Sequence, residues 1–319
     1  MAERATAASA FIIATRNRPE DLVRTVESLV AQTVLPSELC IVDSSDATPT
    51  RPRIEELCSG AGIELDYHHP APRGLTIQRN AGVDRTEGDP VFFVDDDVWL
   101  ADDCHERILE EYERGWPNLG GVRAAPVRPA RPAWYTRSFR KLFGLGGWWP
   151  EASGRVRPGF YVEGISESLG PRRVEYFNGW FMSYAREVFE HECFDEALAG
   201  YGFKEDIDFS YRVAKRGYTL VQTPKAKCDH LKSASARLDS HNLQRMNMAN
   251  QFYLHRKNMP QSTKYKAALW WAWVGLFLLN AGKALRVRDP GLVTGLVEGA
   301  FEQARGKGLI DPPTQAPKT

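Results

Sequence analysis

Residues 90–94 read PVFFV, an apolar run that three consecutive aspartates follow directly. Alternate residues of a strand face opposite sides of a sheet. A short run in which every residue is apolar therefore predicts a strand buried on both faces, as in the centre of a parallel sheet. On either side of it, short strand-like runs alternate with amphipathic helical patterns. This alternation predicts an α/β fold, with a mostly parallel central sheet and helices on both faces.

Hydrophobic periodicity and turn residues give the expected elements around this central strand. Further strands are expected at 9–15, 39–45, 63–69 and 218–222. Helices are expected from Pro19 onward, over 75–83, near 186–192 and over 205–216. Between these groups, regular structure is expected to resume at 174–180.

Two segments depart from the alternation and set the domain organisation. Residues 126–173 are rich in Pro, Gly, Arg and Trp and show no period, which predicts a long loop of the kind that forms lids or binding sites. No acidic residue lies between Asp239 and Asp289, where the pattern becomes helical and basic. We therefore predict an α/β domain over 1–235, which includes the long loop, and a basic, Trp-rich helical C-terminal extension over 236–319.

Within this extension, residues 267–282 carry no charge and are rich in Trp and Leu. A membrane-spanning helix needs about 20 apolar residues, so this shorter run with basic flanks is typical of a helix at a membrane interface. Basic residues beside it would favour anionic lipid headgroups. A helix packed on the α/β domain explains the same composition equally well. The sequence leaves both open, and any membrane contact is assigned to 261–290.

Charge balance and cysteine spacing exclude several classes of protein. Lys plus Arg and Asp plus Glu both total 41, so there is no net field to attract polyanions, and nucleic acid is not an expected partner. The five cysteines never have CxxC spacing, which argues against a disulfide framework and a structural zinc site. Residues 1–10 lack the apolar run of a secretory signal. We expect a cytoplasmic protein, on the cytoplasmic face of the inner membrane if 261–290 binds lipid.

Acidic residues follow two of the predicted strands, at the edge where open α/β sheets bind ligands. Asp43 can accept a hydrogen bond from a nucleobase or a ribose, although Asp before Ser is also ordinary turn chemistry. Asp95, Asp96 and Asp97 repel one another, which favours a divalent cation, Mg²⁺ or Mn²⁺, that bridges two phosphates. A solvated acidic turn is the alternative. The apolar strand before the cluster favours the metal.

A third acidic pair, Glu205 and Asp206, opens a predicted helix. Acids in a first helical turn are favoured by the helix dipole alone. However, the glycines and aromatic residues at 200–203 predict a loop that forms the wall of a pocket. A carboxylate beside such a pocket can take the proton from an acceptor hydroxyl.

Four segments, in this order, resemble glycosyltransferase family two, a group of inverting enzymes with the GT-A fold. The segments are 11–46, GLTIQRNAGV at 74–83, FVDDDV at 93–98 and FDEALAGYGFKEDIDFSYRVAKRGY at 194–218. Together they span roughly residues 9–230, and four motifs in the family's order are far more specific than one.

The resemblance implies a role for each residue at a matching position. Six residues stand at positions where the family contacts the nucleotide or its diphosphate: Thr15, Arg16, Asp43, Arg79, Asp95 and Asp96. Asp95 and Asp97 match the ends of the DxD motif, whose last residue binds the metal. Asp206 matches the catalytic base, with Glu205 beside it. His230 matches a histidine that completes the metal site in some relatives, although a single histidine is more often structural.

The implied activity is transfer of a sugar, with inversion, from a UDP-, dTDP- or GDP-linked donor to a hydroxyl group. The implied acceptor is a saccharide or lipid-linked saccharide in the synthesis of envelope polysaccharide or glycolipid, and the cofactor is Mg²⁺ or Mn²⁺. Ala14 and Arg16 stand where the family often has Pro and Tyr, so the identity of the donor's nucleobase stays open. Residues 126–173 match no segment of the family, which leaves the acceptor open.

Two other functions stay open. A catalytically silent homologue would bind only saccharide or a partner synthase, but the intact acidic motifs disfavour it. A sugar nucleotidyltransferase would also bind a nucleotide on an α/β sheet, with a glycine-rich phosphate loop after the first strand. Residues 14–22, ATRNRPEDL, contain no glycine and disfavour this alternative.

Overall fold

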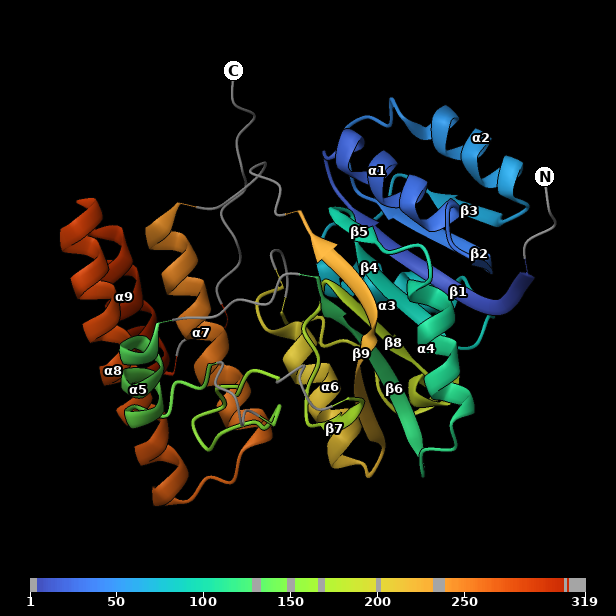
Figure 1. The fold of residues 1–319 in the computed structure, drawn as a ribbon. Helices are drawn as coiled ribbons and strands as arrows, with labels where there is room; N and C mark the ends of the chain where they lie inside the picture. The colour runs from blue at the N-terminus through green and yellow to red at the C-terminus, as the bar shows by residue number, and fades with distance from the viewer. Residues whose placement is uncertain are drawn as a thin grey trace.

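The computed structural model describes residues 5–127, 133–147, 153–165, 170–198, 202–231, 239–306 and 309. Its main feature is a nine-stranded sheet of order β3-β2-β1-β4-β8-β6-β9-β5, with β7 paired to β9 (Figure 1). The strands are β1 (Ala5–Thr15), β2 (Val34–Asp43), β3 (Glu64–His68), β4 (Val91–Asp95), β5 (Val98–Leu100), β6 (Leu119–Pro126), β7 (Arg172–Val174), β8 (Phe181–Tyr184) and β9 (Thr219–His230).

The helices are α1 (Pro19–Val30), α2 (Arg51–Ala61), α3 (Leu75–Asp84), α4 (Cys104–Glu113), α5 (Trp134–Leu142), α6 (Glu205–Lys215), α7 (Ser240–Asn258), α8 (Thr263–Val287) and α9 (Gly291–Ala304). A 3₁₀ helix covers Arg186–Glu190. Six strands (β1, β2, β3, β4, β6 and β9) run in one direction, and β5, β7 and β8 run in the other. The predicted α/β fold with a mostly parallel sheet is therefore confirmed.

Alternate side chains of the central strands face two separate hydrophobic cores, as the period of two requires. Phe11 and Ile13 of β1 face a core that α1, α2 and α4 cover. Ile12, between them, faces a second core built with α3 and α6. In β4, Phe92 joins the first core and Phe93 the second. Helices thus cover both faces, and the doubly apolar PVFFV run is central because β4 lies between β1 and β8.

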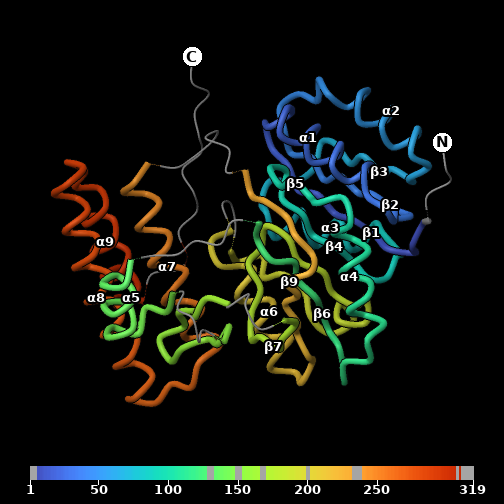
Figure 2. The backbone as a smooth tube through the Cα atoms, in the orientation of Figure 1, coloured from blue at the N-terminus to red at the C-terminus, as the bar shows by residue number. Residues whose placement is uncertain are grey.

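The excursion between β6 and β7 contains more regular structure than the sequence pattern predicts. The short helix α5 lies within it, with no buried residue. The tube in Figure 2 shows α5 beside α8, far from the sheet, before the chain returns to β7. In the loop after α5, Phe143 stacks on Trp271 of α8, with ring centroids 4.7 Å apart. The expected regular structure over 174–180 is present only at Val174, because β7 stops there and β8 starts at Phe181.

Helices α7, α8 and α9 form a group at the end of the molecule away from β1–β3 (Figure 1). Glycines let α9 approach α7 closely: a Cβ on Gly295 would lie 2.0 Å from the His241 carbonyl oxygen. Lys257 of α7 pairs with Asp208 of α6 at 2.8 Å, which ties the group to the α/β part. Helix α8 is 25 residues long, and by length and composition it could cross a membrane.

Candidate functional site

The pairing of β5 with β9 creates a cluster of three ligand-type side chains. Its register places Val98 opposite His230, so His230 comes to lie beside the aspartates that follow β4. His230 Nε2 lies 3.0 Å from Asp97 Oδ1. One ligand atom each from Asp95, Asp97 and His230 lies within 4.8 Å of the others, and no other such trio occurs in the described part of the chain. The structure therefore brings together the three residues predicted to bind metal.

This trio suits a divalent cation of the Mg²⁺ or Mn²⁺ type. Two carboxylates and one imidazole are donors that Mn²⁺ accepts, and carboxylates also suit Mg²⁺. Trp180 supports the site from the side, because its ring lies parallel to the His230 ring at a centroid distance of 6.2 Å. The Trp180 carbonyl oxygen also accepts a hydrogen bond from the Asp95 amide at 3.1 Å. The residues present thus fit the cofactor that the sequence predicts.

Arg79, on α3, connects this cluster to the acidic pair on α6. Its guanidinium donates to Glu205 Oε1 at 2.9 Å and to Asp95 Oδ1 at 3.1 Å. A third bond runs to the carbonyl oxygen of Gly179 at 3.0 Å. The Arg79 side chain is only 3% exposed, so these charge-assisted bonds lie in a medium of low polarity. Two acidic motifs far apart in the sequence therefore share one buried counter-ion.

The first turn of α6 holds Glu205 and Asp206 where the chain passes Gly179. The Gly179 amide donates to Asp206 Oδ2 at 2.6 Å. A Cβ on Gly179 would lie 3.0 Å from Asp206 Cβ and 3.2 Å from Glu205 Oε1, so a side chain here would press on both acidic residues. Burial raises the pKa of Asp206, while the Ile207 amide and Arg79 oppose the rise. Burial, with the nearby Asp206 charge, raises the pKa of Glu205 to about 8.

Asp96 points away from the metal trio, toward the end of β1. Its carboxylate accepts bonds from Thr15 Oγ1 at 2.8 Å and Arg18 Nη1 at 3.0 Å. Burial raises its pKa to about 7, against the opposing effect of Arg18. Both Asp96 and Thr15 are buried, and their side chains satisfy one another. These bonds stabilise the turn that follows β4. Contact of either side chain with a nucleotide stays a prediction.

Asp43 and Arg16 lie near Thr15, at the end of the β1–β2 pair. The parallel register places Thr15 opposite Asp43. Asp43 is buried and accepts bonds from Tyr67 Oη at 2.6 Å and from the Ser45 amide at 2.8 Å. The Nε of Arg16 is buried and has no hydrogen-bond partner among the described residues. The predicted nucleotide-binding residues therefore gather at one edge of the sheet.

Sequence reasoning missed Arg18, Gly179 and Trp180. Arg18 follows the recognised strand end by three positions, and nothing marks it as a partner of Asp96. Gly179 and Trp180 belong to FNGW, a glycine flanked by aromatic residues just before β8. A glycine in an otherwise bulky segment is a signal for close backbone approach. That signal could have identified Gly179. Of the predicted pocket wall, Gly200 and Tyr201 lie outside the described residues.

Comparison with known families and proteins gives a consistent result. The family model described as "Glycosyl transferase family 2" matches residues 10–173. The succinoglycan biosynthesis protein ExoM of Rhizobium meliloti (strain 1021) is 33% identical over 154 residues, which cover 46% of this chain and 48% of that protein. The chain spans about half or less of the length of the curated relatives it matches.

Two solved structures share the fold across nearly the whole chain. The mannosyltransferase PcManGT from Pyrobaculum calidifontis, in complex with GDP-Man and Mn²⁺, has a TM-score of 0.55 at 16% identity and covers 93% of this chain and 87% of its own. GalNAc-T7 with UDP, GalNAc and Mn²⁺ has a TM-score of 0.57 at 15% identity, and the match covers 94% of this chain and 55% of that one. These similarities confirm the expected GT-A type fold.

Proposed function

The chain belongs to glycosyl transferase family 2, and on this premise we propose that it transfers a sugar from a nucleotide diphosphate sugar to an acceptor hydroxyl with inversion. One observation carries the proposal: Arg79 holds Asp95 of the DxD motif and Glu205 of the α6 pair on the same guanidinium. A donor bound at the sheet edge would therefore present its sugar next to the α6 carboxylates. This juxtaposition is what a single displacement needs.

Asp206 is proposed as the general base. The backbone amide of Gly179, in the turn before β8, donates to its Oδ2, and the Ile207 amide donates to its Oδ1, so the carboxylate is held in one orientation. The raised pKa of Asp206 makes the carboxylate a stronger proton acceptor than an exposed aspartate. Glu205, held by Arg79, is proposed to position that network rather than to take the proton.

Asp95, Asp97 and His230 are proposed to hold Mn²⁺ or Mg²⁺, which when bound would neutralise charge on the departing diphosphate. Asp43, Thr15 and Arg16 are proposed to bind the nucleotide at the β1–β2 edge. The neighbouring folds solved with GDP-Man and with UDP support a donor of the GDP or UDP class, and dTDP stays a third candidate. The similarity to a succinoglycan biosynthesis protein supports a polysaccharide or lipid-linked saccharide as acceptor.

We also propose that the protein acts on the cytoplasmic face of the inner membrane, through a patch formed by α5 and α8. Trp134 and Leu142 of α5 are 71% and 67% exposed, and Trp271 of α8 donates a hydrogen bond to the Leu142 carbonyl oxygen at 2.9 Å. Exposed Trp and Leu beside basic residues suit a lipid interface. Replacing Trp134 and Leu142 together by Ser should abolish flotation with anionic vesicles. The same change at Trp99, on β5, should leave flotation intact.

The first test of the proposed activity is thermal stabilisation by UDP, dTDP, GDP and CMP, each with Mn²⁺, Mg²⁺ or chelator. A metal-dependent shift with one nucleotide would identify the donor class. Release of that nucleotide from its sugar donor then measures turnover. Asp206→Asn should abolish release while keeping the thermal shift, and the exposed control Asp84→Asn should keep both.

Each other outcome argues for a different function. Binding without turnover in the unmodified protein, with acceptors supplied, would support a silent homologue. Formation of a nucleotide sugar from a nucleoside triphosphate and a sugar phosphate would support a nucleotidyltransferase. Unchanged release by Asp206→Asn would remove Asp206 from the role of base.

A further inference from the structure

A cavity of about 370 Å³ lies next to the α6 pair, and none of the predicted nucleotide residues lines it. Lys204 and Ile207, which flank the pair, form part of its wall, as do Tyr176 and Asn178, which precede Gly179. The remaining wall comes from α5 and the loop after it, from Phe203, from α7 and from α8. A volume of this size falls in the range of small-molecule sites and has room for a sugar ring.

Two polar atoms in this wall have no hydrogen-bond partner among the described residues, and a ligand could supply one. These atoms, Tyr161 Oη and Asn247 Oδ1, are buried. Buried polar atoms are normally paired, so two such atoms at one cavity can accept or donate a hydrogen bond to a polar ligand there. Aromatic residues also line the cavity, and the rings of the partly exposed Tyr161 and Phe203 can pack on the apolar faces of a sugar, whereas Phe160 is fully buried behind them.

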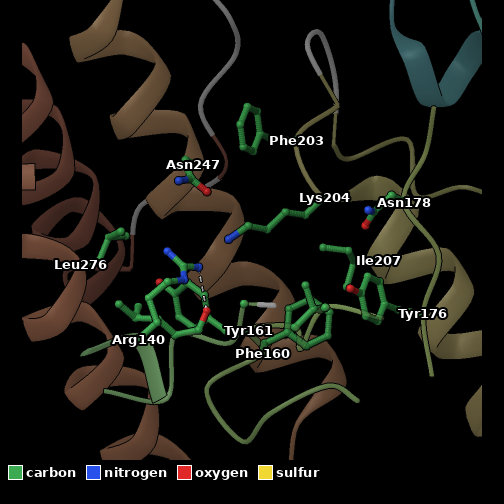
Figure 3. Close-up of a pocket in the computed structure, with 14 residues that line it drawn as sticks. Arg140, Phe160, Tyr161, Tyr176, Asn178, Phe203, Lys204, Ile207, Asn247 and Leu276 are labelled. Atoms are coloured by element: carbon green, nitrogen blue, oxygen red, sulfur yellow. Dashed lines mark hydrogen bonds between the residues drawn. The ribbon is translucent and has the colours of Figure 1, made fainter. Parts of the chain in front are cut away.

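Two cations also face the cavity. Figure 3 shows the Lys204 side chain extending from one side toward Arg140 and Asn247 on the other. Lys204 bonds to Gln251 and lies over the Tyr161 ring, with Nζ 5.0 Å from its centroid. Arg140 donates to the carbonyl oxygens of Gly146 and Leu145. Within the described ranges, neither cation forms an ion pair with a carboxylate.

The backbone at Lys204 is held in a conformation that only a surrounding structure can enforce. Its φ of 69° and ψ of 18° are left-handed, which is costly for a residue with a side chain. The result is that the chain turns into α6 with the Lys204 side chain directed into the cavity, while Glu205 faces Arg79. Burial lowers the pKa of Lys204 to about 7, against the opposing effect of Asp206, and an anion beside Lys204 would favour its charged form.

We infer that this cavity binds the acceptor and selects a saccharide that carries an anionic group, held by Lys204 and Arg140. The inference rests on the proposed function, because it assigns the cavity to the substrate that Asp206 would deprotonate. The anion has two chemical sources: the carboxylate of a uronic acid, or the phosphate of a sugar phosphate or lipid-linked saccharide. Neutral saccharides would leave both cations without a counter-charge.

Binding measurements with defined probes test this inference without an activity assay. Methyl β-glucuronide, glucose 1-phosphate and methyl β-glucoside are titrated into the full-length chain by calorimetry. A charge-assisted contact predicts that one of the anionic probes binds about tenfold or more tightly than the neutral one. Preference for the glucuronide indicates a carboxylate, and preference for the sugar phosphate indicates a phosphate. Equal affinity for all three probes overturns the inference.

Matched variants place the binding in the cavity. Lys204→Met should remove the preference for the anion, Lys204→Arg should retain it, and the exposed control Lys215→Met, at the last residue of α6, should not change it. Arg140→Gln keeps amide donors for the two carbonyl groups but removes the charge, so it serves as a second variant if Lys204→Met fails to fold. A preference that survives both neutral variants contradicts the inference. Nucleotide binding is measured separately with Mn²⁺, and its absence contradicts the proposed function alone.

Discussion

Replacing Arg79 by Met should destabilise the protein more than any substitution of an exposed arginine. Met keeps the unbranched apolar stem of the side chain but removes all three hydrogen bonds, and it leaves Asp95 and Glu205 without their counter-ion. Removing one partner of a buried ion pair typically costs about 3–5 kcal/mol. We expect a loss of that size in the free energy of unfolding, measured by urea denaturation at pH 8.

The loss should depend on pH in a defined direction. Arg79 lowers the pKa of both Asp95 and Glu205, whose pKa values burial otherwise raises. Without Arg79, their folded-state pKa values rise further above the unfolded values. A group with a raised folded pKa contributes stability at low pH and loses it as pH rises through that pKa. The deficit of Arg79→Met should therefore be larger at pH 8 than at pH 5.

Arg85→Met is the matched control, because Arg85 forms a two-bond pair with Asp66 at the protein surface. Exposed pairs contribute at most about 1 kcal/mol, so this variant should unfold close to the unmodified protein. Arg79→Lys should fall between the two, since an ammonium keeps the charge but cannot span both carboxylates. A deficit for Arg79→Met below about 1 kcal/mol at pH 8, or one that grows toward pH 5, would refute the role given to this bridge.

Three further predictions address the metal, the backbone and the base. Asp97→Asn should weaken Mn²⁺ binding by about tenfold or more in an electron paramagnetic resonance titration, and unchanged affinity would exclude it as a ligand. Gly179→Ala should reduce nucleotide release by roughly 10-fold or more, because its Cβ displaces Asp206, while the thermal shift with nucleotide stays. Nucleotide release should rise with pH and show an apparent pKa above that of an ordinary aspartate, since burial raises the pKa of Asp206. A flat profile from pH 5 to 8 would contradict a titrating base.

The local hydrophobic pattern was sufficient to predict the strands and helices whose apolar residues are buried on the sheet. The strands at 9–15, 39–45 and 63–69 match β1, β2 and β3 within a few residues, and the helix from Pro19 matches α1. These elements follow one another along the chain and pair with neighbours. For such elements, hydrophobic period and turn residues carry nearly all of the information that decides the structure.

The sequence pattern did not predict which strands pair when the two strands lie far apart in the sequence. The antiparallel strand β8 enters between β4 and β6, and nothing in FMSY specifies those neighbours. Its insertion brings Gly179 and Trp180 to the site. The position of His230 was predicted by resemblance alone, and its physical cause is the short β5–β9 ladder. Helix α5 escaped prediction because it is short and none of its residues is fully buried, and its one packed aromatic residue, Phe139, contacts Phe143 of the following loop rather than the sheet.

The two sides of the site are built from different parts of the chain, which bears on how specificity can change. The metal trio and the Arg79 bridge depend on strand ends of the sheet and on α3. The cavity depends on the loop after α5 and on α7 and α8, which meet at contacts such as Gln251 Nε2 to the Gly159 carbonyl oxygen at 2.6 Å. Lys204 lines the cavity one residue before Glu205 and so lies directly between the two sides. Substitutions in the loop should therefore alter the acceptor while the Arg79 network stays intact, whereas a change at Lys204 should affect both acceptor binding and the position of the base.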